Sequence, residues 1–368
     1  MSTRNRGQEP LIRLVHREEE SRVRSWIIRI AAVVLGLLVS ALFLNNITHL
    51  DPAAVYASMI KGAFGTDSRT WVTIKDMSLL LCISVALAPA FKMRFWNIGA
   101  EGQVLIGGLV SAACMIYLGN RIPNGLLLLL MALLSTISAA VWGLIPAIFK
   151  AKYRTNETLF TLMMNYIALQ LVQFYVDVWD KKQSHSVGVI NSATKSGWLP
   201  PLLGSQYGWL VLIVMVLAVL MYLYLEQTKQ GYEIAVVGES ENTARYAGIS
   251  VSRVMKRTML ISGGIAGLAG FLEVAGVSHT ISAATAGGRG FTAIIVAWLA
   301  KFNSFGMILI TFLLSFLNRG ANQIASDFNF NKYGSNIIIG IILFFILGSE
   351  FFINYRLVFR KPQKGETK

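Results

Sequence analysis

The stretch FWNIGAEGQ, at residues 95–103, decides the fold of this chain. It places two glycines, an Asn, a Glu and a Gln directly between two apolar runs. Glycine permits a close approach of backbones, and the polar side chains can satisfy the backbone groups that a broken helix leaves free at membrane depth. An ordinary turn outside the membrane is the alternative. Because the polar groups are dense and both flanks are apolar, we interpret the stretch as a structured re-entrant break.

Apolar runs continue along the chain on both sides of this break. We expect membrane segments at residues 27–44, 74–91, 104–118, 126–149, 159–178, 209–225, 258–277, 291–300, 305–317 and 336–353. Hydrophobic residues make up 54% of the chain, charged residues make up 14%, and the mean hydropathy is +0.56. These values exclude a disordered chain and argue against a soluble domain. A crossing helix needs about 20 residues, so the run at 291–300 is interpreted as a half-helix shielded by protein. The pattern predicts an all-α polytopic integral membrane protein of about ten segments.

The basic residues predict the orientation of the chain. It carries 33 Lys and Arg against 19 Asp and Glu, a net charge of +14. If the segments alternate from an inner N-terminus, roughly two thirds of the basic residues lie on the inner side or at its boundary, which is the bias of cytoplasmic loops. We therefore expect a multi-pass protein of the bacterial cell (inner) membrane with both termini cytoplasmic.

Three parts of the chain follow from this pattern: a basic cytoplasmic segment at 1–25, a single membrane domain at 26–353 and a cytoplasmic tail at 354–368. Residues 11–26 mix apolar residues with Arg and Glu. They fit either an amphipathic helix on the inner membrane surface or a solvated basic tail. The run at 27–44 is interpreted as a retained span, because no small-residue cleavage site ends it.

Several kinds of chemistry are absent from the sequence. It has no G-x-x-x-x-G-K-[ST], G-x-S-x-G or H-E-x-x-H motif, and its two cysteines and four histidines show no metal-ligand spacing. We expect no catalytic centre, no metal, no cofactor and no nucleic-acid partner. Asp76, Glu101 and Glu273 are the main acids inside the spans, too few for the proton or sodium relay of an ion-coupled carrier. A substrate-conducting subunit with an external energy source fits better, and a stand-alone ion-coupled secondary transporter is the alternative class.

Four motifs, in order along the chain, resemble one family. They are FWNIGAEGQVLIGG at 95–108, TNETLFTLMMNYIA at 155–168, VVGESENTARYAGIS at 236–250 and GGRGFTAIIVAWLA at 287–300. They are similar to motifs of the membrane permeases of the branched-chain amino acid and simple-sugar class of ABC importers, which have a type II-like importer fold. NIGAEGQ is most similar to the nucleoside permeases that work with a Bmp-type lipoprotein.

The resemblance implies a non-enzymatic permease subunit of an ATP-driven importer for nucleosides, with simple sugars or branched-chain amino acids as same-family alternatives. The partners that it implies are ATPase subunits, a second and homologous permease in a heterodimer, an extracytoplasmic substrate-binding lipoprotein and the lipid bilayer.

Residues 226–257 form the longest cytoplasmic segment between spans and are similar to the family's segment that couples the permease to the ATPase. Ser240 or Asn242 could cap a short helix there, with acids in its first turn and Gly248 at its end. A solvated loop helix without a partner is the alternative. The expected coupling residues are Glu239, Glu241, Ala244, Arg245 and Gly248.

Two further groups of residues are candidates. For the re-entrant break and the translocation path we expect Asn97, Gly99, Glu101, Gly102, Gln103, Asn165, Tyr166 and Phe291, although ordinary helix packing would also account for the last three. Small residues four apart permit close packing of helices in lipid. We expect this role for Gly263, Gly267 and Gly270.

Overall fold

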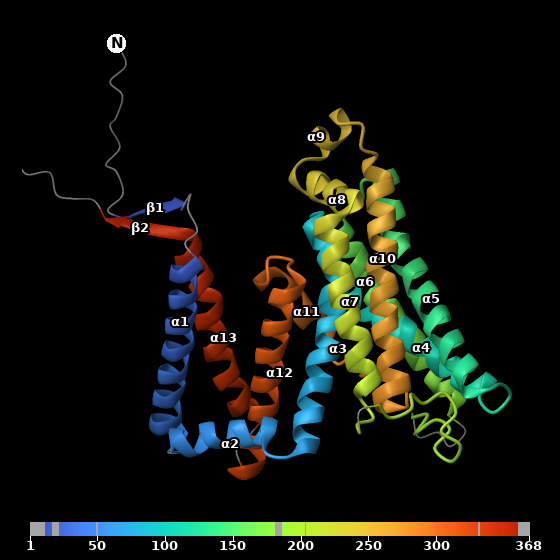
Figure 1. Cartoon of the computed structure of the whole chain (residues 1–368), viewed down its shortest axis with the longest axis horizontal. Coiled ribbons are helices and arrows are strands. Elements are labelled where there is room, and N and C mark those ends of the chain that lie inside the picture. Colours follow the sequence, from blue (N-terminus) through green and yellow to red (C-terminus); the bar gives the residue numbers. More distant parts are fainter. Residues whose placement is uncertain are drawn as a thin grey trace, which may run out of the picture. The chain divides into compact units, whose positions relative to one another are not determined.

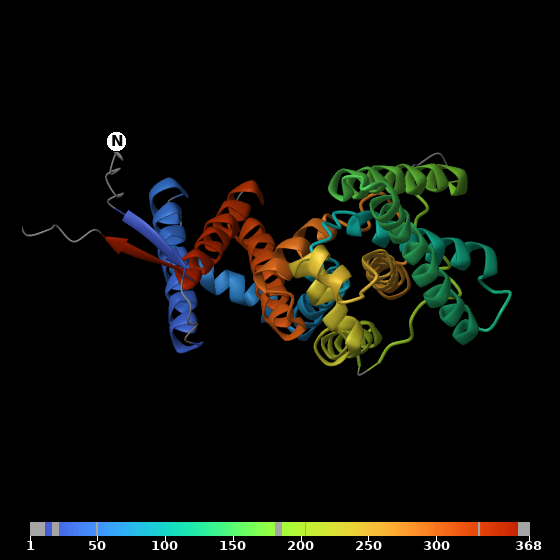
Figure 2. The same cartoon turned by 90° about the horizontal axis from the view of Figure 1, so that it is seen from above.

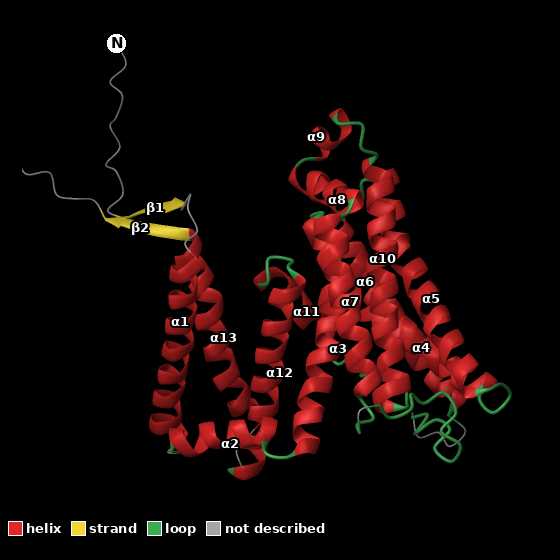
Figure 3. Cartoon of the chain, viewed as in Figure 1, coloured by secondary structure: helices red, strands yellow, loops and turns green. Residues whose placement is uncertain are grey.

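The computed structural model describes residues 12–16, 22–48, 51–180, 186–202, 204–329 and 332–359. Helices make up most of this part of the chain, and its two short strands pair with each other (Figure 3). The chain forms two compact units, which we call the terminal unit (residues 1–63 and 317–368) and the central unit (residues 64–316). The first and last membrane helices, α1 Arg22–Phe43 and α13 Lys332–Asn354, pack on each other in the terminal unit, and the single membrane domain expected at 26–353 stays a prediction.

The central unit is a helical bundle that contains the break (Figure 1). Its helices are α3 Asp67–Lys92, α4 Ala100–Leu118, α5 Asn124–Tyr153, α6 Glu157–Trp179, α7 Gly208–Gln227, α8 Lys229–Glu239, α9 Glu241–Tyr246, α10 Val251–Glu273 and α11 Arg289–Leu299. A π-helical turn, Val274–Ser278, extends α10. Helix α12, Ser304–Asp327, begins in the central unit and ends in the terminal unit.

Three helices supply most of the core of the central unit. Every residue of α3 from Ser78 to Phe91 is buried. Helix α10, seen nearly end-on and in gold in Figure 2, packs on α3, α4 and α5. Helix α5 instead exposes an apolar face that includes Leu129, Leu133 and Ile137. An exposed apolar face of this kind suits contact with lipid or with another membrane protein.

Glycines set the distance between α10 and its neighbours. A Cβ atom at Gly263 would lie 2.5 Å from the backbone oxygen of Ala139 on α5. A Cβ atom at Gly267 would overlap Ala139, and one at Gly270 would overlap the backbone oxygen of Val104 on α4. The three glycines therefore lie where α10 meets the backbones of α4 and α5, a separation that only residues without a side chain allow.

The terminal unit joins the two ends of the described chain. It contains α1 Arg22–Phe43, a π-helical turn Leu44–Thr48, most of α2 Pro52–Phe64, and α13 Lys332–Asn354. Strand β1, Ile12–His16, pairs antiparallel with strand β2, Tyr355–Phe359. The Arg29 side chain on α1 forms an ion pair of 2.8 Å with Glu350 on α13.

The strands correct one interpretation of the sequence. Ile12–His16 were expected within an amphipathic helix or a solvated tail, but the structure places them in β1. Their backbone groups pair with β2, which occupies the start of the expected C-terminal tail. No local pattern indicates this pairing, because the two strands are separated by almost the whole chain.

The membrane architecture agrees with the sequence. Eight helices of the described chain are long and apolar enough to cross a membrane, and two shorter apolar helices lie at Arg289–Leu299 and Ile337–Ile353. Together they correspond to the ten expected segments, and α11 is the short one. The prediction of an all-α polytopic membrane protein is confirmed, with α2 as a helix that the apolar runs did not indicate.

Candidate functional site

The expected break lies between α3 and α4. Helix α3 ends at Lys92, and Arg94 takes a left-handed conformation with φ of 60° that turns the chain. Helix α4 then begins at Ala100. The break is therefore shorter than expected, since Glu101, Gly102 and Gln103 belong to the first turn of α4 and not to the irregular segment.

Asn97 is the centre of a buried polar network in the break. Its side chain is fully buried, and its amide nitrogen donates to the Gln103 side chain at 3.3 Å and to the Ser262 hydroxyl of α10 at 3.2 Å. Its amide oxygen accepts from the backbone N–H of Gly99 at 3.0 Å. These bonds satisfy polar groups that would otherwise be costly inside the bundle. Ser262 lies in the middle of α10, so the break reaches well into the bundle.

Asn165 on α6 caps the N-terminus of α4 from outside. Its amide oxygen accepts from the backbone N–H of Gly102 at 2.8 Å, and its amide nitrogen donates to the carbonyl of Ile98 at 2.8 Å. The first N–H groups of any α-helix lack partners within the helix. A Cβ atom at position 102 would lie only 2.8 Å from this amide oxygen, so the cap requires a glycine there.

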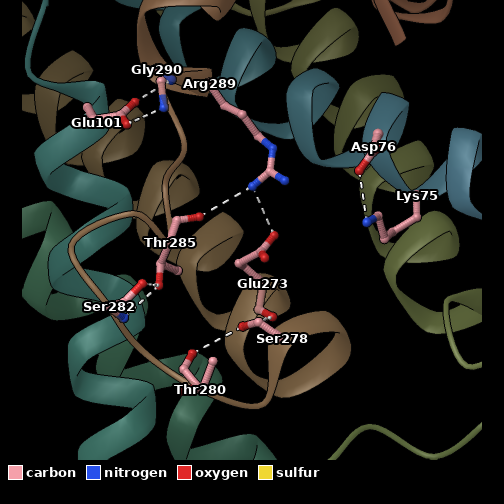
Figure 4. Close-up of polar contacts among 11 residues, drawn as sticks. Lys75, Asp76, Glu101, Glu273, Ser278, Thr280, Ser282, Thr285, Arg289 and Gly290 are labelled. Carbon is pink, nitrogen blue, oxygen red and sulfur yellow. Dashed lines mark hydrogen bonds and ion pairs between the residues drawn. The ribbon is translucent and has the colours of Figure 1, made fainter. Parts of the chain in front are cut away.

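Glu101 caps the N-terminus of α11 in the same way (Figure 4). One carboxylate oxygen accepts from the backbone N–H of Gly288 and the other from that of Gly290, each at 2.7 Å. A Cβ at Gly290 would lie 2.6 Å from the Glu101 backbone nitrogen. Gly287 and Gly288 have φ of +61° and +75°, a region that favours glycine. The glycines of the GGRG motif thus each have a structural reason.

Two ion pairs lie close to this cap (Figure 4). Arg289, the first residue of α11, donates to the carboxylate of Glu273 on α10 at 3.1 Å. On α3, Lys75 and Asp76 form a pair of 2.9 Å. Reasoning from the sequence named the acids Glu273 and Asp76 but missed both cations. A single Arg inside a glycine cluster between apolar runs was the signal that could have found Arg289.

Tyr166 and Phe291 do not join the network. The Tyr166 side chain is 64% exposed and that of Phe291 is 46% exposed. Each lies one residue beyond a member of the network, Asn165 or Gly290, and so points to another face of its helix. The structure brings together the six other residues expected for the break or the path, through the Asn97, Asn165 and Glu101 contacts.

At one end of the central unit, residues 226–257 form two short helices, α8 and α9 (Figure 1). Ser240 is the residue that caps α9, and its hydroxyl accepts from the Thr243 backbone N–H at 3.2 Å. Glu241 pairs with Arg245 at 3.3 Å along the exposed side of α9. Ala244 is the buried residue of α9, and Gly248 lies in the turn that follows this helix, with φ of +76°. Glu239 lies at the end of α8.

At the same end of the unit, α8 is fixed to its neighbours by an ion pair and a close backbone contact, and grooves lie beside α9. Arg257 on α10 pairs with Glu233 on α8 at 3.0 Å, and a Cβ at Gly238 would overlap the carbonyl of Lys92. One groove, of about 540 Å³, is lined in part by Lys150, Arg154, Glu241, Arg245 and Ser250. Tyr246 projects from the end of α9 with 94% of its surface exposed. Tyr246 is not among the residues expected for coupling, although an exposed Tyr on a short helix is a frequent contact residue in interfaces.

The opposite end of the unit has a pocket of about 680 Å³. Among the residues that line it, Trp198 and His279 stack with ring centroids 3.7 Å apart and planes 4° apart. Burial lowers the pKa of the His279 imidazole, although a hydrogen bond with the backbone of Val274 acts in the other direction. This imidazole is therefore neutral at pH 7.

A polytopic bundle with a satisfied re-entrant break, a half-helix and an exposed short helix at one end has the architecture of a membrane transport permease. The chain belongs to the family described as branched-chain amino acid transport system, permease component, whose model matches residues 72–347. Members of this family are transport components and not enzymes.

Three relatives show how similar the chain is to characterised permeases. The guanosine ABC transporter permease protein NupP of Bacillus subtilis is 31% identical over 78% of this chain and 83% of its own length. The glucose ABC transporter permease protein TsgB13 of Haloferax volcanii is 29% identical over 86% of each chain. The nucleoside ABC transporter permease protein NupB of Lactococcus lactis is 26% identical over 78% of this chain and 81% of its own. No solved structure matches the chain.

Proposed function

We propose that this chain is the permease subunit of an ABC importer that takes up nucleosides. The assignment of nucleosides as the substrate rests on the similarity to a guanosine permease, which is 31% identical over most of both chains. The similarity to a nucleoside permease of a second organism supports it. The capped break supplies what a path for a polar solute requires, namely irregular backbone and polar groups that are satisfied at membrane depth.

The path follows the N-terminal end of α11. Gly288 is exposed there and binds the carboxylate of Glu101, close to the Arg289–Glu273 pair, and Phe291 is exposed on another face of the same helix. Within the membrane, charged groups and irregular backbone are tolerated where they face protein or a water-filled cavity, and they are not tolerated where they face lipid. This supports a role in the path for the network of Asn97, Asn165 and Glu101.

The end of the central unit that carries α9 faces the cytoplasm. Basic residues gather there, and loops rich in Lys and Arg remain inside. They include Lys92, Arg94, Lys150, Lys152, Arg154, Lys229, Arg253 and Arg257. Both termini lie on the cytoplasmic side as well. The antiparallel pairing of β1 with β2 supports one common side for the two ends.

The importer needs partners for this chain. The ATPase docks on α9 and its grooves, with Glu239, Glu241, Ala244, Arg245 and Gly248 forming or shaping the contact. A homologous second permease completes the membrane unit, since two differently named guanosine permease proteins of one Bacillus, NupP and NupQ, both resemble this chain. An extracytoplasmic lipoprotein delivers the solute.

Uptake of labelled guanosine in the source cells tests the substrate. Deleting the gene should abolish uptake, and the wild-type gene should restore it. Unlabelled uridine should compete, while glucose and leucine in excess should not. Competition by glucose alone would favour the sugar alternative, which the similarity to TsgB13 also supports, and competition by leucine would favour an amino acid.

Purification of the full chain through a tag tests the energy source. We expect an ATPase subunit to co-purify, and we expect ATP hydrolysis to depend on that subunit. If proteoliposomes that hold this chain alone accumulate guanosine on a proton or sodium gradient, the chain is an ion-coupled carrier and the proposal is wrong.

A further inference from the structure

The charges around the N-terminus of α11 compensate one another within the chain. The two N–H groups that begin α11 carry the positive end of the helix dipole, and Glu101 binds both. Arg289 on the same turn binds Glu273, and Lys75 binds Asp76. Helices α4, α10 and α11 thus contribute charges that have partners of opposite sign at hydrogen-bond distance, and α3 carries its own Lys75–Asp76 pair (Figure 4).

The position of Glu101 is unusual for a half-helix in a transporter. Half-helix N-termini in membrane transporters commonly point at an anionic group of the substrate. Here the chain supplies that anion itself, and Gly290 has no side chain because one would collide with Glu101. The carboxylate is therefore built into the contact and is not an accidental neighbour.

We propose that Glu101 is a specificity-determining residue that occupies the N-terminus of α11 and so restricts the path to uncharged solutes. The inference rests on the proposed function, because it assumes that the solute passes this helix end. An anionic solute would meet the Glu101 carboxylate and would have to displace it. An uncharged, hydroxyl-rich solute such as a nucleoside can exchange hydrogen bonds with water and side chains while the pairs stay intact. A carboxylate-bearing amino acid and a nucleotide are both excluded on this basis.

Anion binding by the purified full chain tests the proposal without any transport measurement. In Glu101→Gln the amide keeps the size of the side chain but carries no charge and can accept from only one of the two N–H groups, so the positive end of α11 is no longer neutralised and attracts a small anion. The probe is inorganic sulfate at millimolar concentration, compared with chloride at the same ionic strength, and the readout is the apparent melting temperature. We expect saturable stabilisation of Glu101→Gln by sulfate, with an apparent affinity about fivefold or more above that of the wild type.

The matched control is Glu350→Gln, the same change at a carboxylate that pairs with an Arg on another membrane helix. It should respond to sulfate as the wild type does, which measures the general stabilising effect of sulfate on proteins. If Glu101→Gln does not fold, Glu101→Asp is the second variant. Its shorter side chain should lose one of the two bonds and give a smaller shift of the same sign.

Transport by the complete importer gives the second readout. Sulfate should inhibit guanosine uptake by Glu101→Gln and leave wild-type uptake unchanged. If wild-type sulfate binding equals that of both Glu101 variants, Glu101 does not exclude anions and the inference is wrong, whatever the substrate. If the wild type carries no guanosine but the sulfate response of Glu101→Gln appears, the proposed substrate fails and the role of Glu101 stands.

Discussion

Replacing Asn165 with Leu tests the capping of α4 most directly. The two side chains are similar in volume, so the change creates little cavity and removes mainly hydrogen bonds. The Gly102 N–H and the Ile98 carbonyl would each lose a bond of 2.8 Å inside the bundle. A buried backbone group without its partner costs about 1–3 kcal/mol, so the two together cost about 2–6 kcal/mol. Because water can reach part of a broken cap, we expect about 3 kcal/mol, near the lower end of this range.

The assay is thermal unfolding of the purified full chain in detergent, followed by tryptophan fluorescence, since Trp96 lies in the break. Tyr166→Leu is the control, because it places the same new residue one position further along the same helix. Tyr166 is 64% exposed, and we expect a change within about 0.5 kcal/mol. If Asn165→Leu and Tyr166→Leu melt at the same temperature, Asn165 does not hold the break and the reasoning fails.

Three other predictions follow from local geometry. Gly267→Ala should destabilise the chain by about 2 kcal/mol because the new Cβ collides with α5, whereas Gly340→Ala, whose Cβ would have nothing within 4 Å, should leave stability unchanged or raise it by up to about 1 kcal/mol. Equal melting temperatures of the two variants would contradict the packing argument. Gly248→Val forces a β-branched residue toward φ of +76° at a cost of about 1–2 kcal/mol, so the chain should still insert in the membrane while the ATPase activity of the complex falls. If the variant complex has wild-type ATPase activity, the turn after α9 has no role in coupling. The pKa of His279 is lowered in the folded chain, so its contribution to stability should be constant above about pH 7 and should fall as the pH drops below about 6.5, the value of the unfolded chain. His279→Gln should lose this pH dependence, and the prediction is wrong if the melting temperatures of wild type and variant change in the same way between pH 5 and 8.

Local features of this chain could be predicted from its sequence, and long-range contacts could not. The cap at Ser240 and the turn at Gly248 depend on residues within one or two helical turns, and the length of the run at 291–300 alone indicated a half-helix. Glu101 was a candidate because an acid between apolar runs stands out. Its partners at Gly288 and Gly290 lie 187 and 189 residues away along the chain, and no sequence pattern links them.

The same limit explains why Arg289 and the sheet were missed. Arg289 lies within the glycine-rich motif at 287–290, and no pattern in the sequence links it to an acid. Only the structure shows that Arg289 of α11 pairs with Glu273 of α10, whereas the partner of Lys75 is the adjacent Asp76 and could have been read from the sequence. The boundaries of α4 were misjudged for a related reason, because Asn165 on α6 allows the helix to begin at Ala100 and not after the polar residues.

The pairing of β1 with β2 and of α1 with α13 has a consequence for the synthesis of the protein. Helix α1 leaves the ribosome well before α13 does, because it precedes α13 in the chain. At usual bacterial rates the roughly 300 residues between them take about 15 to 60 s to make. During that time the central unit can assemble from consecutive helices, whereas α1 must wait in the membrane with Arg29 apart from Glu350. Helix α1 is therefore among the last of the described helices to be folded, although it is made long before α13, and it depends on the insertion machinery or on lipid until its partner arrives.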